Sequence, residues 1–411
     1  MTRRGWFITL AATAAMTLSY LDRQALAALA PTITADLHLT NTQYGWLGSA
    51  FSVMYLLAGP LAARWCDRLG ARRALLWGVL AWSACAAMHS LAVGFVSFLA
   101  LRLALGAVEA PSLPAGAQTV QAVLPAADRA RGMALLFAGM SVGSALAPPI
   151  AIGIGAWLGW RASFIGLALI AVMWVPLWLR VTRGGALPHV PPAHRTDWRV
   201  VLKQPMVIRG LVGLAAIIPV STFTLQWGAK FFAAAHVGKA AYATYLLASG
   251  IAYDAGAIVF GDLASRRARR VGSAPHRLLL GISTAFAAGG LAAMALAPDL
   301  TIVVAALIAM SIGRGGYTAI VNADTLARVH DDEIATAAAL IASAQSVIIL
   351  AINPIIGASV DATHTYAPSM LAIAAFTVLP FTAWAAWRAR PSRARPAHRA
   401  APRSRCLSSD P

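Results

Sequence analysis

Acidic and basic side chains occur inside otherwise apolar stretches of this 411-residue sequence, among them Asp22, Arg23, Arg102, Glu109 and Arg314. Charges are costly in such surroundings and are usually paired or functional. A guanidinium stays ionised at any relevant pH and can hold a carboxylate through two parallel hydrogen bonds. A buried carboxylic acid is neutral when alone and ionised beside a cation, so it can carry a proton. The pattern therefore predicts a buried site that binds an anion and exchanges protons.

Twelve long apolar runs carry these residues and indicate the fold class. The chain is 59% hydrophobic and 12% charged, whereas soluble domains contain about 25% charged residues. Each run can form a helix that crosses a bilayer, and none has the strict alternation of a barrel strand. The sequence therefore predicts an all-α integral membrane protein with twelve transmembrane helices, and it excludes a soluble enzyme, a nucleic-acid-binding module and a disordered protein. The runs are residues 6–33, 42–63, 74–95, 97–124, 133–157, 161–179, 207–229, 241–263, 277–297, 301–325, 334–358 and 366–387.

The basic residues indicate how the helices are oriented. The formal net charge is +18, from 33 Lys and Arg against 15 Asp and Glu, and most of the basic residues lie at the two ends and in alternate connections. Because Lys and Arg in short loops stay cytoplasmic, both termini are predicted to be cytoplasmic. The charge thus marks topology in a multi-pass cell membrane protein, and it requires no nucleic-acid partner.

The longest internal connection divides the helices six and six, which is expected of two similar halves. We predict an N-terminal half over residues 1–180, a cytoplasmic linker over 181–206, a C-terminal half over 207–388 and a disordered basic tail over 389–411. The tail is either solvated or bound to anionic lipid head groups.

The segment ARWCDRLGARR, residues 63–73, resembles the loop 2–3 signature of the major facilitator superfamily, G-x-x-x-D-R-x-G-R-R. A carboxylate and several guanidinium groups at the cytoplasmic helix ends can pair when the halves close. The related GDLASRRARR stretch after the eighth run has Ser265 where the acid would stand, so gating by this motif is better supported in the first half. The matching gating residues are Asp67, Arg68, Gly70, Arg72 and Arg73.

Three further stretches are similar to the anion:cation symporter family: SYLDRQALAALAPTI, RLALGAVEAPSLPAG, and LPAADRARGMALLFAGMSVGSALAPP followed by GWRASF. The resemblance is dense from Tyr20 to Trp178 and weaker in the second half. It implies the major facilitator fold and proton-coupled import of a sugar acid or other organic anion by alternating access. It also implies a transporter, not an enzyme, in the bacterial inner membrane. We expect protons as the coupling ion, no cofactor, and a monomer.

Matched residues in the first half receive separate roles. Counting at about 1.5 Å per residue places Asp22 and Arg102 at similar depth, where they can pair, and the resemblance implies that both serve proton coupling. Glu109, two turns deeper, is expected to carry the proton, being neutral when alone and ionised if a cation approaches; the alternative is a neutral acid that holds neighbouring helices together. The motif Tyr-x-Asp-Arg implies that Arg23 binds the substrate carboxylate.

Polar residues elsewhere complete the predicted substrate site. Tyr20 is nearly one turn before Arg23, and Tyr55 matches a tyrosine that often lines the family's cavity, although it is equally suited to packing. Arg314 is predicted to face Glu109 or the ligand, the alternative being a structural pair with Asp254. Further candidates are Gln226 and Lys230, which share one helix face, and Asn353, whose amide beside Pro354 is suited to substrate hydroxyl groups.

Two functions remain open from sequence. The leading one is proton-driven import of an organic anion, which two buried arginines favour. The alternative is a proton-driven exporter of a drug or metabolite on the same fold. The three cysteines and nine histidines show no metal-ligand spacing, so no metal site is predicted, and the sequence does not identify the anion.

Overall fold

The structure is a computed structural model that describes residues 2–187, 198–271, 276–326, 329 and 334–387. The predicted tail, 389–411, and the central part of the predicted linker lie outside the described residues. The described residues form helices and no strand. The helices are α1 Thr2–Asp36, α2 Asn41–Met88, α3 Phe95–Glu109, α4 Ser112–Val123, α5 Ala126–Leu158, α6 Trp160–Val181, α7 Trp198–Leu202, α8 Pro205–Thr222, α9 Gly228–Ala234, α10 Lys239–Val271, α11 Arg277–Leu296, α12 Leu300–Leu326, α13 Ile334–Thr363 and α14 Ala367–Ala386.

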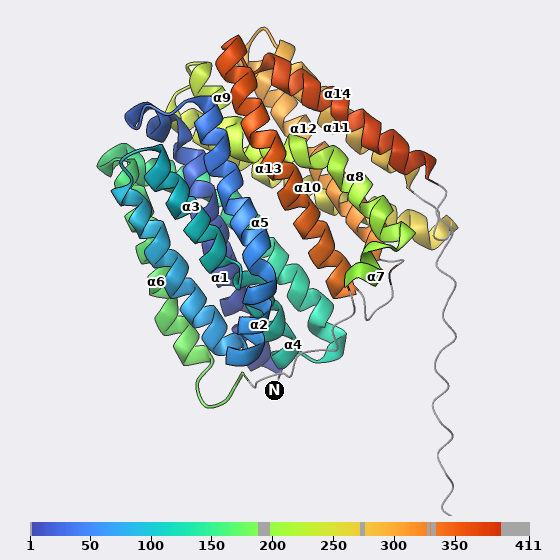
Figure 1. Cartoon of the computed structure of the whole chain (residues 1–411). Coiled ribbons are helices and arrows are strands. Elements are labelled where there is room, and N and C mark those ends of the chain that lie inside the picture. Colours follow the sequence, from blue (N-terminus) through green and yellow to red (C-terminus); the bar gives the residue numbers. More distant parts are fainter. Residues whose placement is uncertain (1, 188–197, 272–275, 327–328, 330–333, 388–411) are drawn as a thin grey trace, which may run out of the picture.

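Two groups of helices lie side by side. In Figure 1 the blue-to-green helices α1 to α6 pack on one side of the molecule, and the yellow-green to red helices α8 to α14 pack on the other. Contacts between the groups run mainly between α2 and α13 and between α5 and α10. We refer to α1–α6 as the first bundle and to α8–α14 as the second bundle.

Ten helical segments among the described residues are long and apolar enough to cross a membrane. Helix α2 has 48 residues, about 72 Å at 1.5 Å per residue, which is more than twice the hydrocarbon thickness of about 30 Å. The two parts of α2 were predicted as separate helices, and they meet at Gly70. The backbone there has φ 74° and ψ 154°, a conformation that favours glycine. Helix α1 is not among the ten, because its polar residues lower its mean hydropathy.

Two predicted helices are interrupted beside candidate site residues. The run 97–124 divides into α3 and α4, so that Glu109 is the last residue of α3 and Pro111 precedes α4. The run 207–229 contains a π-helical segment, Phe223–Trp227, between α8 and α9, and Gln226 lies within it. Proline and π-helical interruptions redirect side chains and are frequent at functional sites.

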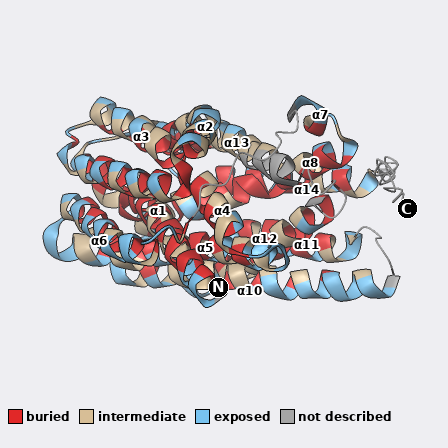
Figure 2. Ribbon diagram, turned by 90° about the horizontal axis from the view of Figure 1, so that it is seen from below, coloured by how far each residue is buried: buried red, intermediate tan, exposed pale blue. Residues whose placement is uncertain are grey.

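Large apolar side chains cover the outer surface of the bundles. Val96, Trp157, Met173 and Leu379 are each at least two-thirds exposed. Figure 2 shows exposed residues on the outward faces of the helices and buried residues where the helices meet. An apolar surface of this extent is incompatible with water and fits a lipid bilayer.

Candidate functional site

The end of α3 meets the middle of α1 in a buried ion pair. The Nη2 of Arg23 donates to Oε2 of Glu109 at 3.0 Å, and Nε donates to the same oxygen at 3.2 Å. Glu109 is fully buried, whereas the Arg23 side chain keeps 16% exposure. The second carboxylate oxygen, Oε1, has no hydrogen-bond partner. Glu109 therefore has a cation beside it in this structure, and that cation is the guanidinium that was predicted to bind the substrate.

Three aromatic rings surround the Arg23 guanidinium. Its central carbon lies 4.3 Å from the ring centroid of Tyr20, 4.5 Å from Phe51 and 4.7 Å from Tyr55. Such rings attract a cation and limit its contact with water. The sequence predicted both tyrosines but missed Phe51. Phe51 precedes Tyr55 by one helical turn, and this spacing was the sequence signal that could have identified Phe51. In the structure the two rings stack with their centroids 5.7 Å apart.

Asp22 and Arg102 are buried but form no ion pair with each other. Arg102 directs Nε to the backbone oxygen of Leu47 at 3.3 Å, and its guanidinium lies 5.1 Å from the Phe51 ring. Oδ2 of Asp22 and Nη1 of Arg102 lack hydrogen-bond partners. The predicted pair is therefore not formed. Counting residues along a helix predicts how deep a side chain lies in the membrane. It does not predict which neighbouring helix that side chain faces.

In the second bundle, two predicted amides lie together. Asn353 Nδ2 donates to Gln226 Oε1 at 2.9 Å, and Trp227 Nε1 donates to Asn353 Oδ1 at 3.0 Å. The Tyr44 hydroxyl of α2 donates to the backbone oxygen of Gln226. A Cβ at Gly48 would collide with Gln226, so glycine allows α2 to approach this amide cluster closely. The amides thus lie at the boundary between the two bundles.

Arg314 lies on α12 and is 3% exposed, and its Nε has no hydrogen-bond partner. Its guanidinium lies 4.6 Å from the Tyr253 ring. The described residues give it no ion pair with Glu109, nor with Asp254, the predicted structural alternative. Asp254 instead accepts a hydrogen bond of 2.5 Å from Ser141 of α5, although it interacts electrostatically with Arg314.

The residues predicted to form the gating motif lie around the turn of α2. Asp67 accepts a hydrogen bond from Gln118 of α4 at 2.8 Å. Arg72 Nε donates to Thr182 at 3.0 Å, and Trp178 Nε1 donates to the Arg72 backbone oxygen at 3.0 Å. Arg68 and Arg73 are exposed. These bonds attach the α2 turn to α4 and α6 within the first bundle.

Asp361 of α13 joins the bundles at the opposite end of α2. Its carboxylate accepts bonds from the backbone nitrogens of Asn41 and Thr42, at 2.9 and 2.8 Å, and from their side chains at 2.8 and 2.6 Å. A carboxylate is stabilised by the unpaired N–H groups and the dipole of a helix N-terminus. Lys230 donates nearby to Thr34 at 3.3 Å. We call this Asp361 contact the α2 clasp.

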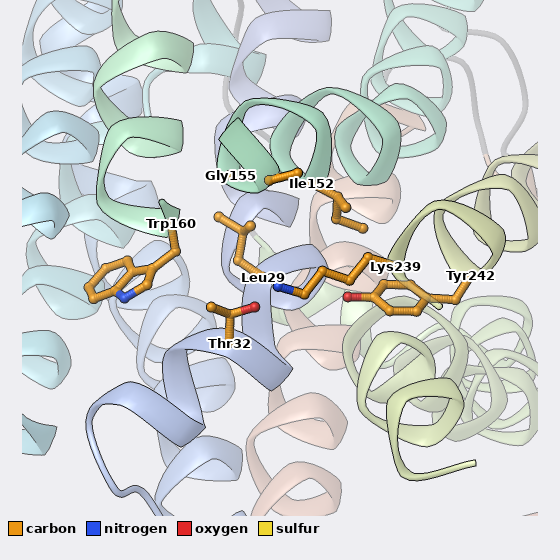
Figure 3. Close-up of a pocket in the computed structure, with 8 residues that line it drawn as sticks. Leu29, Thr32, Ile152, Gly155, Trp160, Lys239 and Tyr242 are labelled. Atoms are coloured by element: carbon orange, nitrogen blue, oxygen red, sulfur yellow. The ribbon is translucent and has the colours of Figure 1, made fainter. Parts of the chain in front are cut away.

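Two hollows open near that end of the helices. One has about 340 Å³ and is lined by Lys230, Asn41 and Tyr366, among others. The other, about 10 Å³, has room for one water molecule. Figure 3 shows Lys239 of α10 in the smaller hollow, extending toward Thr32 of α1. Apart from Lys230, none of the predicted site residues lines either hollow.

Comparison with known proteins places this geometry in a family. A sequence profile for the Major Facilitator Superfamily matches residues 12–353. The chain is 30% identical over 220 residues to a hexuronate transporter of Bacillus subtilis, covering 51% of this chain and 52% of that protein. It is 30% identical over 266 residues to a chloramphenicol resistance protein of Streptomyces lividans, covering 62% and 66%.

The chain thus spans about half the length of the hexuronate transporter that it matches. Among solved structures, it resembles an inward-facing, unoccupied bacterial homologue of the human lysosomal transporter Spinster. The TM-score is 0.81 at 20% sequence identity, over 93% of this chain and 97% of that one. At that identity the likeness concerns the fold alone. With a family profile that covers most of its length and with many apolar helices, this multi-pass membrane protein belongs to the Major Facilitator Superfamily.

Proposed function

We propose that the protein is a proton-coupled symporter that imports an organic anion, a sugar acid or another carboxylate, by alternating access. The observation that carries this proposal is the Arg23–Glu109 pair. One guanidinium, enclosed by aromatic rings, is held by an acid that can be neutralised by a proton. A substrate carboxylate and the ionised Glu109 side chain therefore compete for the same cation.

This competition gives a coupling mechanism. When Glu109 takes a proton, it loses its charge and its strongest attraction to Arg23, so the guanidinium becomes available for two parallel hydrogen bonds to the substrate. When the substrate and the proton leave, Glu109 again neutralises Arg23 and lowers the cost of the buried charge. A carrier that can reorient either fully loaded or with this pair formed moves the anion and the proton together.

Asp22 and Arg102 are assigned to the same proton pathway. Their unpartnered polar atoms are buried, and unsatisfied buried charges are expensive. Asp22 also interacts electrostatically with Glu109, so the charge on one acid alters proton binding to the other. Tyr20, Tyr55, Gln226, Asn353 and Arg314 are assigned to the substrate.

The positions of the contacts between bundles support alternating access. The α2 clasp and the Lys230–Thr34 bond lie where α1 ends and α2 begins. With twelve crossings and cytoplasmic termini, this is the outer end, so the clasp must open to admit an anion from outside. The gating motif at the α2 turn then lies at the cytoplasmic end. We propose that this monomer works in the bacterial inner membrane with protons and no other cofactor.

The similarity to a chloramphenicol resistance protein supports the second candidate, a proton-driven exporter. The Arg23–Glu109 pair favours an anionic cargo over a neutral or cationic drug, because its exchangeable ligand is itself a carboxylate.

Uptake by purified protein in sealed vesicles separates the two functions. With an inward proton gradient and a radiolabelled hexuronate outside, we expect accumulation that a protonophore abolishes. Protein-free vesicles are the control. Accumulation that survives loss of the gradient would contradict symport, and proton-driven removal of chloramphenicol without hexuronate uptake would favour the exporter.

A further inference from the structure

We infer that the transported anion carries two acidic groups and that Arg314 binds the second one. This inference rests on the proposed function, because it assigns one carboxylate to Arg23. It goes further by naming the substrate class: a dicarboxylate, with an acid at each end of a hydroxylated chain.

The charge environment of Arg314 is the first argument. Two other arginines have an acid beside them: Arg209 pairs with Asp324 at 2.5 Å, and Arg23 pairs with Glu109 at 3.0 Å. Arg102 has no ion pair either, but its Nε donates to the backbone oxygen of Leu47 at 3.3 Å. Arg314 is as buried as Arg209 yet forms no ion pair among the described residues, and its Nε has no partner. A buried cation without a paired acid is strongly unfavourable. An anionic ligand would supply the missing partner.

Asp254 does not fill that role in this structure. Its Oδ1 accepts the Ser141 hydroxyl at 2.5 Å, across the boundary between α10 and α5. The remaining interaction with Arg314 acts over a distance longer than an ion pair. The guanidinium instead lies over the Tyr253 ring, an arrangement that leaves its N–H groups available because the ring contacts the face of the cation.

The position of Arg314 relative to Arg23 is the second argument. Each guanidinium lies against a tyrosine ring, Arg23 at 4.3 Å from Tyr20 and Arg314 at 4.6 Å from Tyr253. Both tyrosines lie near α5: a Cβ at Gly143 would meet the Tyr20 side chain at 3.0 Å, and Asp254, next to Tyr253, accepts the Ser141 hydroxyl across the boundary between the bundles. Each bundle therefore contributes one guanidinium, beside a tyrosine ring, near the boundary. A molecule with a carboxylate at each end matches two such cations.

Equilibrium binding to the purified full-length protein tests the inference with two matched probes. D-glucarate and D-gluconate have the same six-carbon hydroxylated chain, and they carry two carboxylates and one carboxylate, respectively. A charged hydrogen bond contributes enough to change affinity by about 10- to 150-fold. We expect glucarate to bind more tightly than gluconate by that factor, and Arg314→Gln to remove most of the difference while leaving gluconate affinity within a few-fold.

Controls separate this inference from the proposed function. Arg161→Gln removes an exposed arginine and should preserve the ratio, whereas Arg23→Lys should weaken both probes together. Equal wild-type affinities, or equal weakening of both probes by Arg314→Gln, would overturn the second-carboxylate assignment and leave anion binding intact. Absence of binding by either probe would overturn both proposals. If Arg314→Gln fails to fold, the wild-type ratio and Arg314→Lys, which keeps the charge, still decide the question.

Discussion

The two bundles carry different kinds of polar groups to their shared boundary. The first bundle places both members of an ion pair, Arg23 and Glu109, within one set of helices. The second bundle presents an amide cluster, Gln226 with Asn353, and Arg314, a cation that forms no ion pair with any residue that the structure describes. Of these two arrangements at the boundary, the first pairs an acid with a base, and protonation of the acid can break that contact. We therefore propose that proton coupling belongs to the first bundle and recognition of the rest of the substrate to the second.

Removing the acid should have the largest effect. Glu109→Gln mimics the protonated side chain and cannot release a proton, so proton-driven accumulation in vesicles should be abolished while exchange of labelled for unlabelled substrate continues. Asp36→Asn is the matched control, because Asp36 pairs with Arg161 at 2.7 Å but is 45% exposed. Accumulation by Glu109→Gln at the wild-type level would show that Glu109 only holds helices together.

Substitutions of Arg23 test whether substrate binding depends on the planar shape of the guanidinium or only on its positive charge. Arg23→Lys keeps the charge but loses the planar fork, so we expect it to lower substrate affinity almost as much as Arg23→Ala, by about 10- to 150-fold. The competing view makes Arg23 a structural partner of Glu109. In that case the melting temperature without ligand would fall and affinity would not, and adding Glu109→Gln would restore the melting temperature.

The α2 clasp offers a change that involves neither proton nor substrate chemistry. Asp361→Asn weakens the charge-assisted hydrogen bonds to Asn41 and Thr42. The equilibrium constant for opening this end of the protein should therefore rise by roughly tenfold. A cysteine introduced at Ser49, which contacts the Leu350 backbone at 3.0 Å, should then react faster with a membrane-impermeant thiol reagent. Asp36→Asn again serves as the control. An unchanged rate would remove Asp361 from the gate.

Removing one amide of the cluster should have the smallest effect, and it should separate substrate binding in the second bundle from proton coupling in the first. Asn353→Ala removes neutral hydrogen bonds, so affinity for a hydroxylated anion should fall by about 2- to 10-fold. The number of protons transported per anion should stay the same, because Glu109 and Arg23 are untouched. A changed stoichiometry, measured from paired proton and substrate fluxes, would place part of the coupling in the second bundle.

Sequence predicted the helices better than the pairings. The apolar runs and the loop signature predicted a helical member of the superfamily, because hydropathy and motif spacing are local properties. The contacts of Arg23 were not predictable in the same way. Its partner is 86 residues away at a helix break, and the bond depends on which way each side chain leaves its helix. The same limit explains the unformed Asp22–Arg102 pair and the omission of Phe51.

The most direct test of the central claim is proton uptake on binding. Substrate is added to purified protein in weakly buffered solution, and the pH change is recorded with the heat of binding. If a carboxylate displaces Glu109 from Arg23, the released acid takes up about one proton per anion bound, and Glu109→Gln should bind substrate without that uptake. Proton uptake that is the same in wild type and in Glu109→Gln would contradict the account.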